Sequence, residues 1–151
     1  MKKQLQNSKK NTELLSVNLK EIVYRNLNLY GFVAHKSIGL GGSEFDIVAS
    51  AYNTTIYLLT CSLHKTTTFA LRKNTTEEQR AFFTRLVSRG VECGVAIQID
   101  EGLIFYLPYR LVVASEIPNF EIITTQLDLL RTHLHKWRTL YENYNKEQYH
   151  Y

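Results

Sequence analysis

The residues that most often carry chemistry occur in this chain without the spacing of the common site motifs. Gly39, Gly41 and Gly42 form a glycine-rich bend, but it lacks the Gly-Lys-Ser/Thr of a P-loop and leads into an expected strand rather than a helix. We therefore expect a bend between two strands and no phosphate site. The five histidines lack metal-finger spacing, and no Gly-x-Ser-x-Gly segment marks a serine nucleophile.

Cys61 and Cys93 lie in apolar, strand-like segments. Two cysteines are too few for a disulfide framework and lack the partner cysteines of a structural zinc site. We expect two buried thiols and an intracellular, reducing compartment, either cytoplasmic or nuclear. No apolar run approaches the roughly 20 residues of a membrane span, and no apolar segment behind the N-terminal lysines indicates a secretory signal, so we expect no membrane partner.

One set of polar residues stands in a fixed order along alternating helices and strands. Along the chain we expect a helix, then three strands, the first of them opened by Gly31-Phe32, and then a second helix. In chain order these elements carry Glu21, Asp46, Thr60, Ser62 and Gln79. Over about residues 13–107 this order resembles the PD-(D/E)XK nuclease superfamily and, within it, the archaeal-type Holliday junction resolvases. In that family a helix supplies a glutamate, and an aspartate lies in a strand similar to residues 45–49. The next strand carries Glu-x-Lys, and a following helix often carries a glutamine.

The resemblance implies a Mg²⁺ site built from carboxylates on neighbouring strands. Hard oxygen ligands hold the metal, which polarises the scissile phosphate and lowers the pKa of the attacking water. Asp46 takes the place of the metal-binding aspartate, Glu21 that of the helical glutamate and Gln79 that of the glutamine. Glu44, two residues before Asp46, shares its strand face and could add a carboxylate. We expect Asp46 and Thr60 on adjacent strands, with Glu21 nearby.

The chain departs from the family where Glu-x-Lys is expected, because it reads Thr60-Cys61-Ser62. Small hydroxyls bind Mg²⁺ poorly and carry no charge, so Asp46 alone makes a weak metal site. We therefore expect an inactive site without a cofactor, and Mg²⁺ only if other residues supply the missing groups. Lys65 and Glu78 are the candidates, although Lys65 lies about 10 Å beyond Ser62 along an extended strand and needs a bend to return.

Each of these residues also has an ordinary structural interpretation. Asp46 could pair with Lys36 or Arg72, Glu21 could be an exposed helical charge, and Gln79 could be a surface residue near a helix start. Only their order and spacing around an apolar strand favour the nuclease resemblance.

A weaker resemblance is to the C-terminal domain of tRNA-splicing endonucleases. It rests on residues 23–27, on Gly31-Phe32 and on residues 44–46, and it implies metal-free RNA cleavage by Tyr, His and Lys. Tyr52 and His64 are the candidates in this chain, but their spacing does not match well.

The formal net charge is +4 at pH 7, and the four lysines among residues 1–10 equal that excess. We expect these residues to form a mobile basic tail. Positive charge also gathers around the second helix. Together these features permit DNA or RNA as a partner. The residues predicted to contact nucleic acid are Lys9, Lys10, Lys36, Arg72, Lys73 and Arg80.

Apolar periodicity predicts an α/β fold with a mixed central sheet of about five strands flanked by helices, in the order α-β-β-β-α-β-β-α. The expected helices begin near residues 12, 76 and 122, and the strands span residues 32–36, 44–50, 55–63, 92–99 and 103–107. Strand 55–63 is almost continuously apolar or β-branched, which is typical of a central strand. We expect one domain over residues 11–145, followed by a polar tail at 146–151.

These observations favour a nucleic-acid-associated protein that keeps a nuclease-like fold around an inactive site. One alternative is a metal-dependent endonuclease of the Holliday junction resolvase type with relocated catalytic residues. Another is a non-catalytic structural subunit that binds a protein partner, or a second copy, through its C-terminal helix. The apolar face of that helix is either core or interface, and it comprises Leu127, Leu130, Leu134, Trp137 and Tyr141.

Overall fold

The structure is a computed structural model that describes residues 19–37, 43–51, 53–115, 119–121 and 129–148. Several sequence predictions lie outside these residues. They concern the basic tail at 1–10 with Lys9 and Lys10, the glycine-rich bend at 39–42, Tyr52, Leu127 and the chain end at 149–151.

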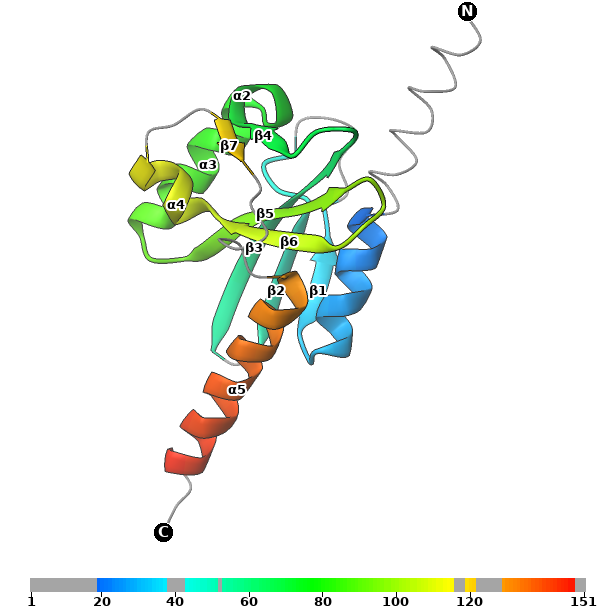
Figure 1. Ribbon diagram of the computed structural model, residues 1–151. Coiled ribbons are helices and arrows are strands. Elements are labelled where there is room, and N and C mark those ends of the chain that lie inside the picture. The colour runs from blue at the N-terminus through cyan, green and yellow to red at the C-terminus, as the bar shows by residue number, and fades with distance from the viewer. Residues whose placement is uncertain (1–18, 38–42, 52, 116–118, 122–128, 149–151) are drawn as a thin grey trace, which may run out of the picture.

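A five-stranded mixed sheet forms the centre of the molecule (Figure 1), with the strand order β1-β2-β3-β5-β6. Only β3 and β5 are parallel, and the other neighbours are antiparallel. A parallel pair requires a crossover connection, which here contains helix α3. The strands are β1 (Val33–Lys36), β2 (Ile47–Ala51), β3 (Thr54–Leu63), β5 (Glu92–Ile99) and β6 (Ile104–Pro108). The predicted central strand and mixed sheet are confirmed.

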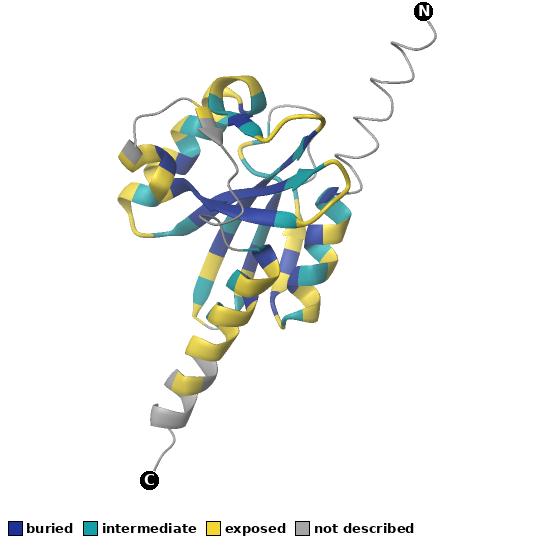
Figure 2. Ribbon diagram, viewed as in Figure 1, coloured by how far each residue is buried: buried dark blue, intermediate teal, exposed yellow. Residues whose placement is uncertain are grey.

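Helices cover both faces of the sheet (Figures 1 and 2). The first helix, described over residues 19–29, and α5 (Leu130–Gln148) pack on one face, while α3 (Glu77–Ser88) and α4 (Tyr109–Ser115) pack on the other. Strand β3 contributes to both cores, because Leu58 points toward the first helix and Leu59 toward α3. Burial on both faces explains its continuous apolar run.

The helix ends follow local rules that the sequence already carries. Gly31 and Gly90 adopt φ values of 91° and 73°, the left-handed conformation that ends a helix without a Cβ clash. Thr76 caps α3, since its side chain accepts a hydrogen bond from the Gln79 N–H while the Gln79 side chain accepts one from the Thr76 N–H.

The structure adds four short elements to the predicted order. They are β4 (Thr68–Ala70), α2 (Leu71–Asn74), α4 and β7 (Asn119–Glu121), and β4 pairs with β7 in a separate two-stranded sheet. Elements of three or four residues are too short to show a period, so hydrophobic spacing does not reveal them. Helix α4 is also absent from the predicted order, because Pro108, which ends β6, is typical of the start of a loop.

The apolar face of α5 belongs to the core over its first half. Leu130 and Leu134 are buried, and the Trp137 ring lies 6.3 Å from that of Phe32 and 5.5 Å from that of Tyr106, centroid to centroid. The second half of α5 runs beyond the sheet (Figure 1), and Leu140 there is 67% exposed.

Candidate functional site

Asp46 lies directly before β2, at the point where β2 and β3 stop pairing through their backbones. Its own N–H donates to the carbonyl of Leu58 (2.9 Å). Its carboxylate Oδ2 then accepts the next N–H of β3, that of Thr60 (2.7 Å), and also the Thr60 hydroxyl (3.1 Å). The side chain thus takes the place of a ladder carbonyl. The expected juxtaposition of Asp46 with Thr60 is present.

Ser62 follows on the same face of β3 as Thr60. Its Oγ is buried, and among the described residues it has no hydrogen-bond partner. An unsatisfied buried hydroxyl is uncommon in folded proteins. Thr60 and Ser62 together supply two neutral hydroxyls and no charge.

Cys61 points to the opposite face of β3 and is buried there. Burial, reinforced by the negative charge of Asp46, raises the pKa of the Cys61 thiol to about 12. The thiol is therefore protonated at neutral pH, and a protonated thiol is neither a nucleophile nor a metal ligand.

Gln79 reaches the segment before β2 from the first turn of α3. Its Nε2 donates to the carbonyl of Ser43 (3.2 Å), three residues before Asp46. Because the other end of the amide is held by the Thr76 N–H (2.9 Å), the side chain ties the start of α3 to the segment that carries Asp46.

Glu21 lies on the first helix, where its carboxylate forms ion pairs with two basic side chains. Its carboxylate contacts Lys36 Nζ (2.5 Å) and Arg25 Nε (3.2 Å), and the hydrogen bond from Lys36 chiefly lowers the pKa of Glu21. Within the described part of the chain, no hydrogen bond or ion pair joins Glu21 to Asp46. Lys36 therefore pairs with Glu21 and not with Asp46, contrary to one of the ordinary structural interpretations of Asp46.

Lys20 is linked to the backbone of Asp46 through Ser37, and sequence reasoning missed this connection. Its ammonium donates to the carbonyl and to the hydroxyl of Ser37 (both 3.2 Å), and the Ser37 N–H donates to the carbonyl of Asp46 (2.9 Å). Nothing in the sequence signals this arrangement, because it depends on how the first helix lies over the end of β1.

In the part of the chain that the structure describes, no hydrogen bond or ion pair joins either relocation candidate to Asp46. Lys65 lies in the bend five residues beyond Thr60, with a left-handed φ of 55°, and its N–H donates to Asp100 Oδ1 (2.9 Å). The neighbouring His64 also contacts Asp100, with 3.0 Å between Nδ1 and Oδ1. Glu78 is exposed in the first turn of α3.

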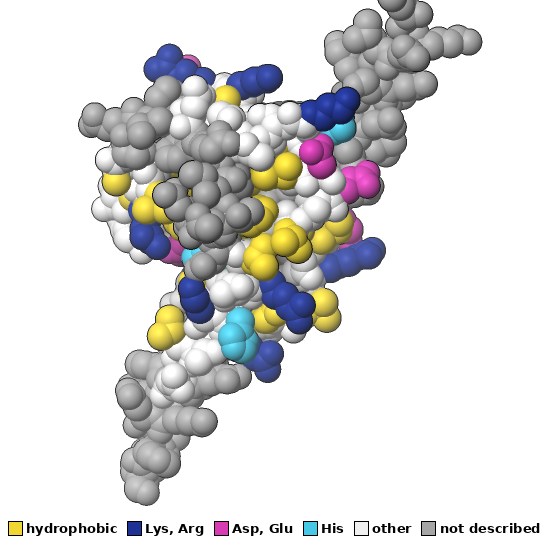
Figure 3. Space-filling view, viewed as in Figure 1, with side chains coloured by type: hydrophobic (Ala, Val, Ile, Leu, Met, Phe, Trp, Pro, Cys, Tyr) yellow, Lys and Arg dark blue, Asp and Glu magenta, His cyan; other side chains and the backbone are white. Residues whose placement is uncertain are grey.

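The predicted basic residues do not share one role. Arg72 and Lys73 are exposed on α2, whereas Arg80 is half-buried and braces the corner between α2 and α3. Its Nη1 donates to the carbonyl (2.7 Å) and hydroxyl (3.1 Å) of Thr75. On the face drawn in Figure 3, lysines and arginines lie in separate groups around the rim rather than in one continuous patch.

The residues around Asp46 do not fit a Mg²⁺ site. Mg²⁺ prefers charged oxygen ligands in an octahedral arrangement. Asp46 supplies one carboxylate, one oxygen of which already accepts two hydrogen bonds from Thr60. Nor do the described residues contain any group of three or more His, Cys, Asp or Glu side chains that could hold a metal ion.

Comparisons with known proteins bear on the fold. No protein-family profile matches the chain, and no curated protein does. A solved structure that matches is that of Hjc from Archaeoglobus fulgidus, a Holliday junction resolvase from an archaeal hyperthermophile. The match has a TM-score of 0.59 and 19% sequence identity, and it covers 78% of this chain and 98% of that one.

The chain therefore has the restriction-endonuclease-like fold that the sequence resemblance predicted. This similarity concerns the fold alone. The chemistry of the site has to be inferred from the residues that form it. No helix in the described part of the chain is long and apolar enough to cross a membrane.

Proposed function

We propose that this protein associates with nucleic acid and uses a nuclease-like fold whose catalytic site is inactive. The observation that carries the proposal is the engagement of Asp46 by Thr60, at the position where the resemblance requires a glutamate. A threonine that donates to the aspartate satisfies it as a structural hydrogen-bond acceptor, whereas a glutamate there would repel it unless a cation lay between them.

The neighbouring position supports the same proposal. Ser62 stands where the resemblance requires a lysine, and a hydroxyl cannot stabilise charge that develops on a phosphate as an ammonium can. A fold that lacks these groups keeps its capacity to bind, since phosphate contacts come from surface cations rather than from the catalytic residues. Intracellular DNA or RNA is the partner class that this proposal assigns.

A pair of measurements tests the proposal. Titrations of labelled four-way junction, duplex and single-stranded DNA, and of RNA, should give binding that weakens steeply with salt. The same substrates incubated with Mg²⁺ or Mn²⁺ should remain uncut. Absence of binding to all four at low salt would replace this proposal with a structural subunit that binds a protein through α5, whose outer half extends from the body.

One observation favours a second candidate, a metal-dependent endonuclease of the resolvase type with a relocated lysine. Lys20 donates to Ser37, whose N–H donates to the backbone carbonyl of Asp46, whereas in the described part of the chain no hydrogen bond links Lys65 or Glu78 to either residue. Under this candidate, Mn²⁺-dependent cleavage would be present in the wild type and would disappear in both Asp46→Ala and Lys20→Ala. Lys65→Ala is the matched control, because it removes an equal charge from a bend whose backbone is hydrogen-bonded to Asp100 instead.

A further inference from the structure

The sheet is covered unevenly on the side of α3 and α4. The core on that side contains residues of β3, β5 and β6, whereas β1 and β2, both described in full, contribute nothing to it. Two rows of side chains cross this uncovered region. One row is His35, Val48 and Tyr57, and the other is Val33, Ser50 and Thr55. Val33 is 63% exposed, and His35, Ser50 and Thr55 are exposed as well.

An aromatic cluster stands where this open region meets α3. The ring of Phe45 lies 5.2 Å from that of Tyr57 and 6.0 Å from that of Phe82, and the rings of Tyr57 and Phe82 are 5.5 Å apart, centroid to centroid. All three side chains are half-buried. Their mutual contacts fix the rings, so this part of the surface is rigid as well as apolar.

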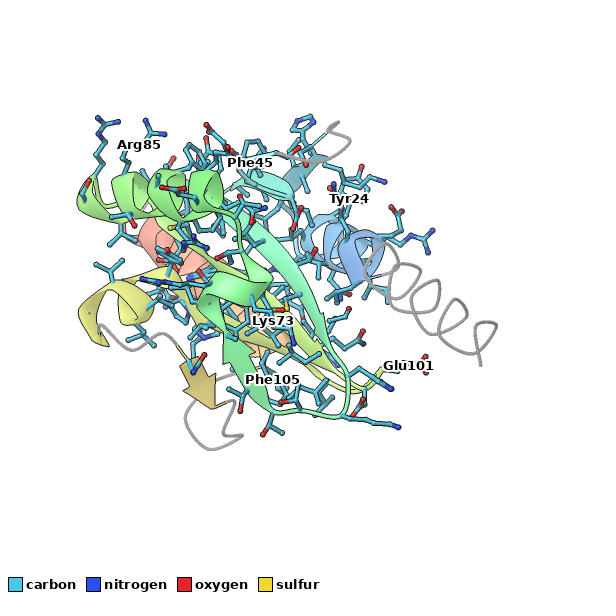
Figure 4. All side chains as sticks on the ribbon, turned by 90° about the horizontal axis from the view of Figure 1, so that it is seen from above. Tyr24, Phe45, Lys73, Arg85, Glu101 and Phe105 are labelled. Atoms are coloured by element: carbon cyan, nitrogen blue, oxygen red, sulfur yellow. The ribbon has the colours of Figure 1, made fainter. Side chains whose placement is uncertain are left out.

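Arginines border the cluster. The guanidinium carbon of Arg85 lies 5.9 Å from the centre of the Phe82 ring, and Arg89 is exposed four residues further on. Residues 82 and 85 lie three apart on α3, and Arg89, four residues further on, is its C-cap, so the three follow one side of the helix to its end. Figure 4 shows Arg85 and Phe45 on the same side of the molecule. The open face therefore combines rigid aromatic rings with cations at its border.

We propose that this face stacks unpaired bases of single-stranded nucleic acid. The inference rests on the proposed function and narrows it, because only bases that are free of a duplex can lie on a protein ring. Stacked bases and aromatic side chains attract through their flat faces regardless of sequence, while arginines contact the adjoining phosphates. The rings of Phe45, Tyr57 and Phe82 supply the platform, and Arg85 and Arg89 supply the cations.

Anisotropy titrations with a short labelled poly(dT) strand and with a labelled duplex test the inference. Tyr57→Leu and Phe82→Leu should weaken binding of the strand about tenfold each and leave duplex binding unchanged. Arg85→Gln, an exposed change that leaves the core intact, should weaken strand binding several-fold. The matched control is Tyr24→Leu, which removes a half-buried ring beneath Lys36 (4.8 Å) from the opposite face and should have no effect.

The outcomes separate this inference from the proposed function. Duplex binding without strand binding, or strand binding that Tyr57→Leu, Phe82→Leu and Arg85→Gln leave unchanged, overturns the inference and leaves the function standing. Absence of binding to any nucleic acid overturns both. A wild-type dimer that Arg85→Gln or Tyr57→Leu converts to a monomer assigns the face to a second copy and also overturns the inference.

Discussion

At the scale of single residues, the first role of Asp46 is structural, because its side chain extends the hydrogen bonding between β2 and β3. Its carboxylate accepts the N–H of Thr60 at the point where the pairing of β2 with β3 ends. Asp46→Ala should lower the free energy of unfolding by about 1–3 kcal/mol, because a partly buried N–H is deprived of a charged acceptor. Asp46→Asn keeps an acceptor oxygen and should cost about 1 kcal/mol or less. Urea unfolding of the three proteins measures both changes, and equal stability of all three would contradict this role.

Restoring the two missing charged groups tests whether the scaffold still has nuclease geometry. Thr60→Glu combined with Ser62→Lys places a carboxylate and an ammonium two residues apart on one strand face, next to Asp46. The double variant should gain Mg²⁺ affinity that calorimetry detects, since a second carboxylate adds the charged oxygens the metal prefers. Adding Asp46→Ala should abolish that affinity. A double variant that binds no more Mg²⁺ than the wild type would show that the scaffold no longer has that geometry.

At the scale of elements, α3 depends on its first turn, which also positions the site. Thr76→Ala removes the side-chain cap and should lower the free energy of unfolding by about 0.5–2 kcal/mol. Ser88→Ala, an exposed change at the other end of the same helix, should alter it by less than about 0.5 kcal/mol. Chemical denaturation compares the two variants, and equal effects would show that the capping box contributes little.

The sequence predicted the elements that carry a long hydrophobic pattern. Strand β3, helix α3 and the hairpin of β5 and β6 could be identified because each has eight or more periodic residues or a clear turn between its strands. Short elements such as β4 and β7 could not, because each exists only through pairing with the other, about fifty residues apart in the chain.

The candidate site divides in the same way. The juxtaposition of Asp46 and Thr60 could be predicted, since Asp46 directly precedes the recognisable strand β2 and Thr60 lies in its neighbour β3. The approach of Lys20 to Ser37 and the row of His35, Val48 and Tyr57 could not, because they depend on helix placement and strand register. Register is set by packing of the whole sheet, so it cannot be predicted from the sequence of any one strand.

At the scale of the whole molecule, buried cysteine thiols and a buried tyrosine hydroxyl make the fold less stable at high pH. Burial raises the pKa of both Cys61 and Cys93 to about 12, from an ordinary value of 9, and raises that of Tyr106 as well. Their contribution is complete below pH 9 and disappears as pH rises toward 12, since the unfolded chain ionises first. The free energy of unfolding should fall by about 1–3 kcal/mol between about pH 8 and pH 10. Urea unfolding at the two pH values checks this, and constant stability would contradict it.

The distribution of charge over the chain leads to the last prediction. The chain has 18 Lys and Arg against 14 Asp and Glu, so deleting residues 2–10, with their four lysines and no acids, leaves equal numbers. If these lysines bind phosphate, the deletion should weaken duplex binding and flatten the plot of log affinity against log salt. The slope should decrease by about 0.9 for each phosphate that the shortened chain no longer neutralises, because each neutralised phosphate releases a condensed counterion. A truncated chain that keeps the full slope would assign phosphate binding to the folded domain, with Arg72, Lys73 and Arg89 as the next residues to test.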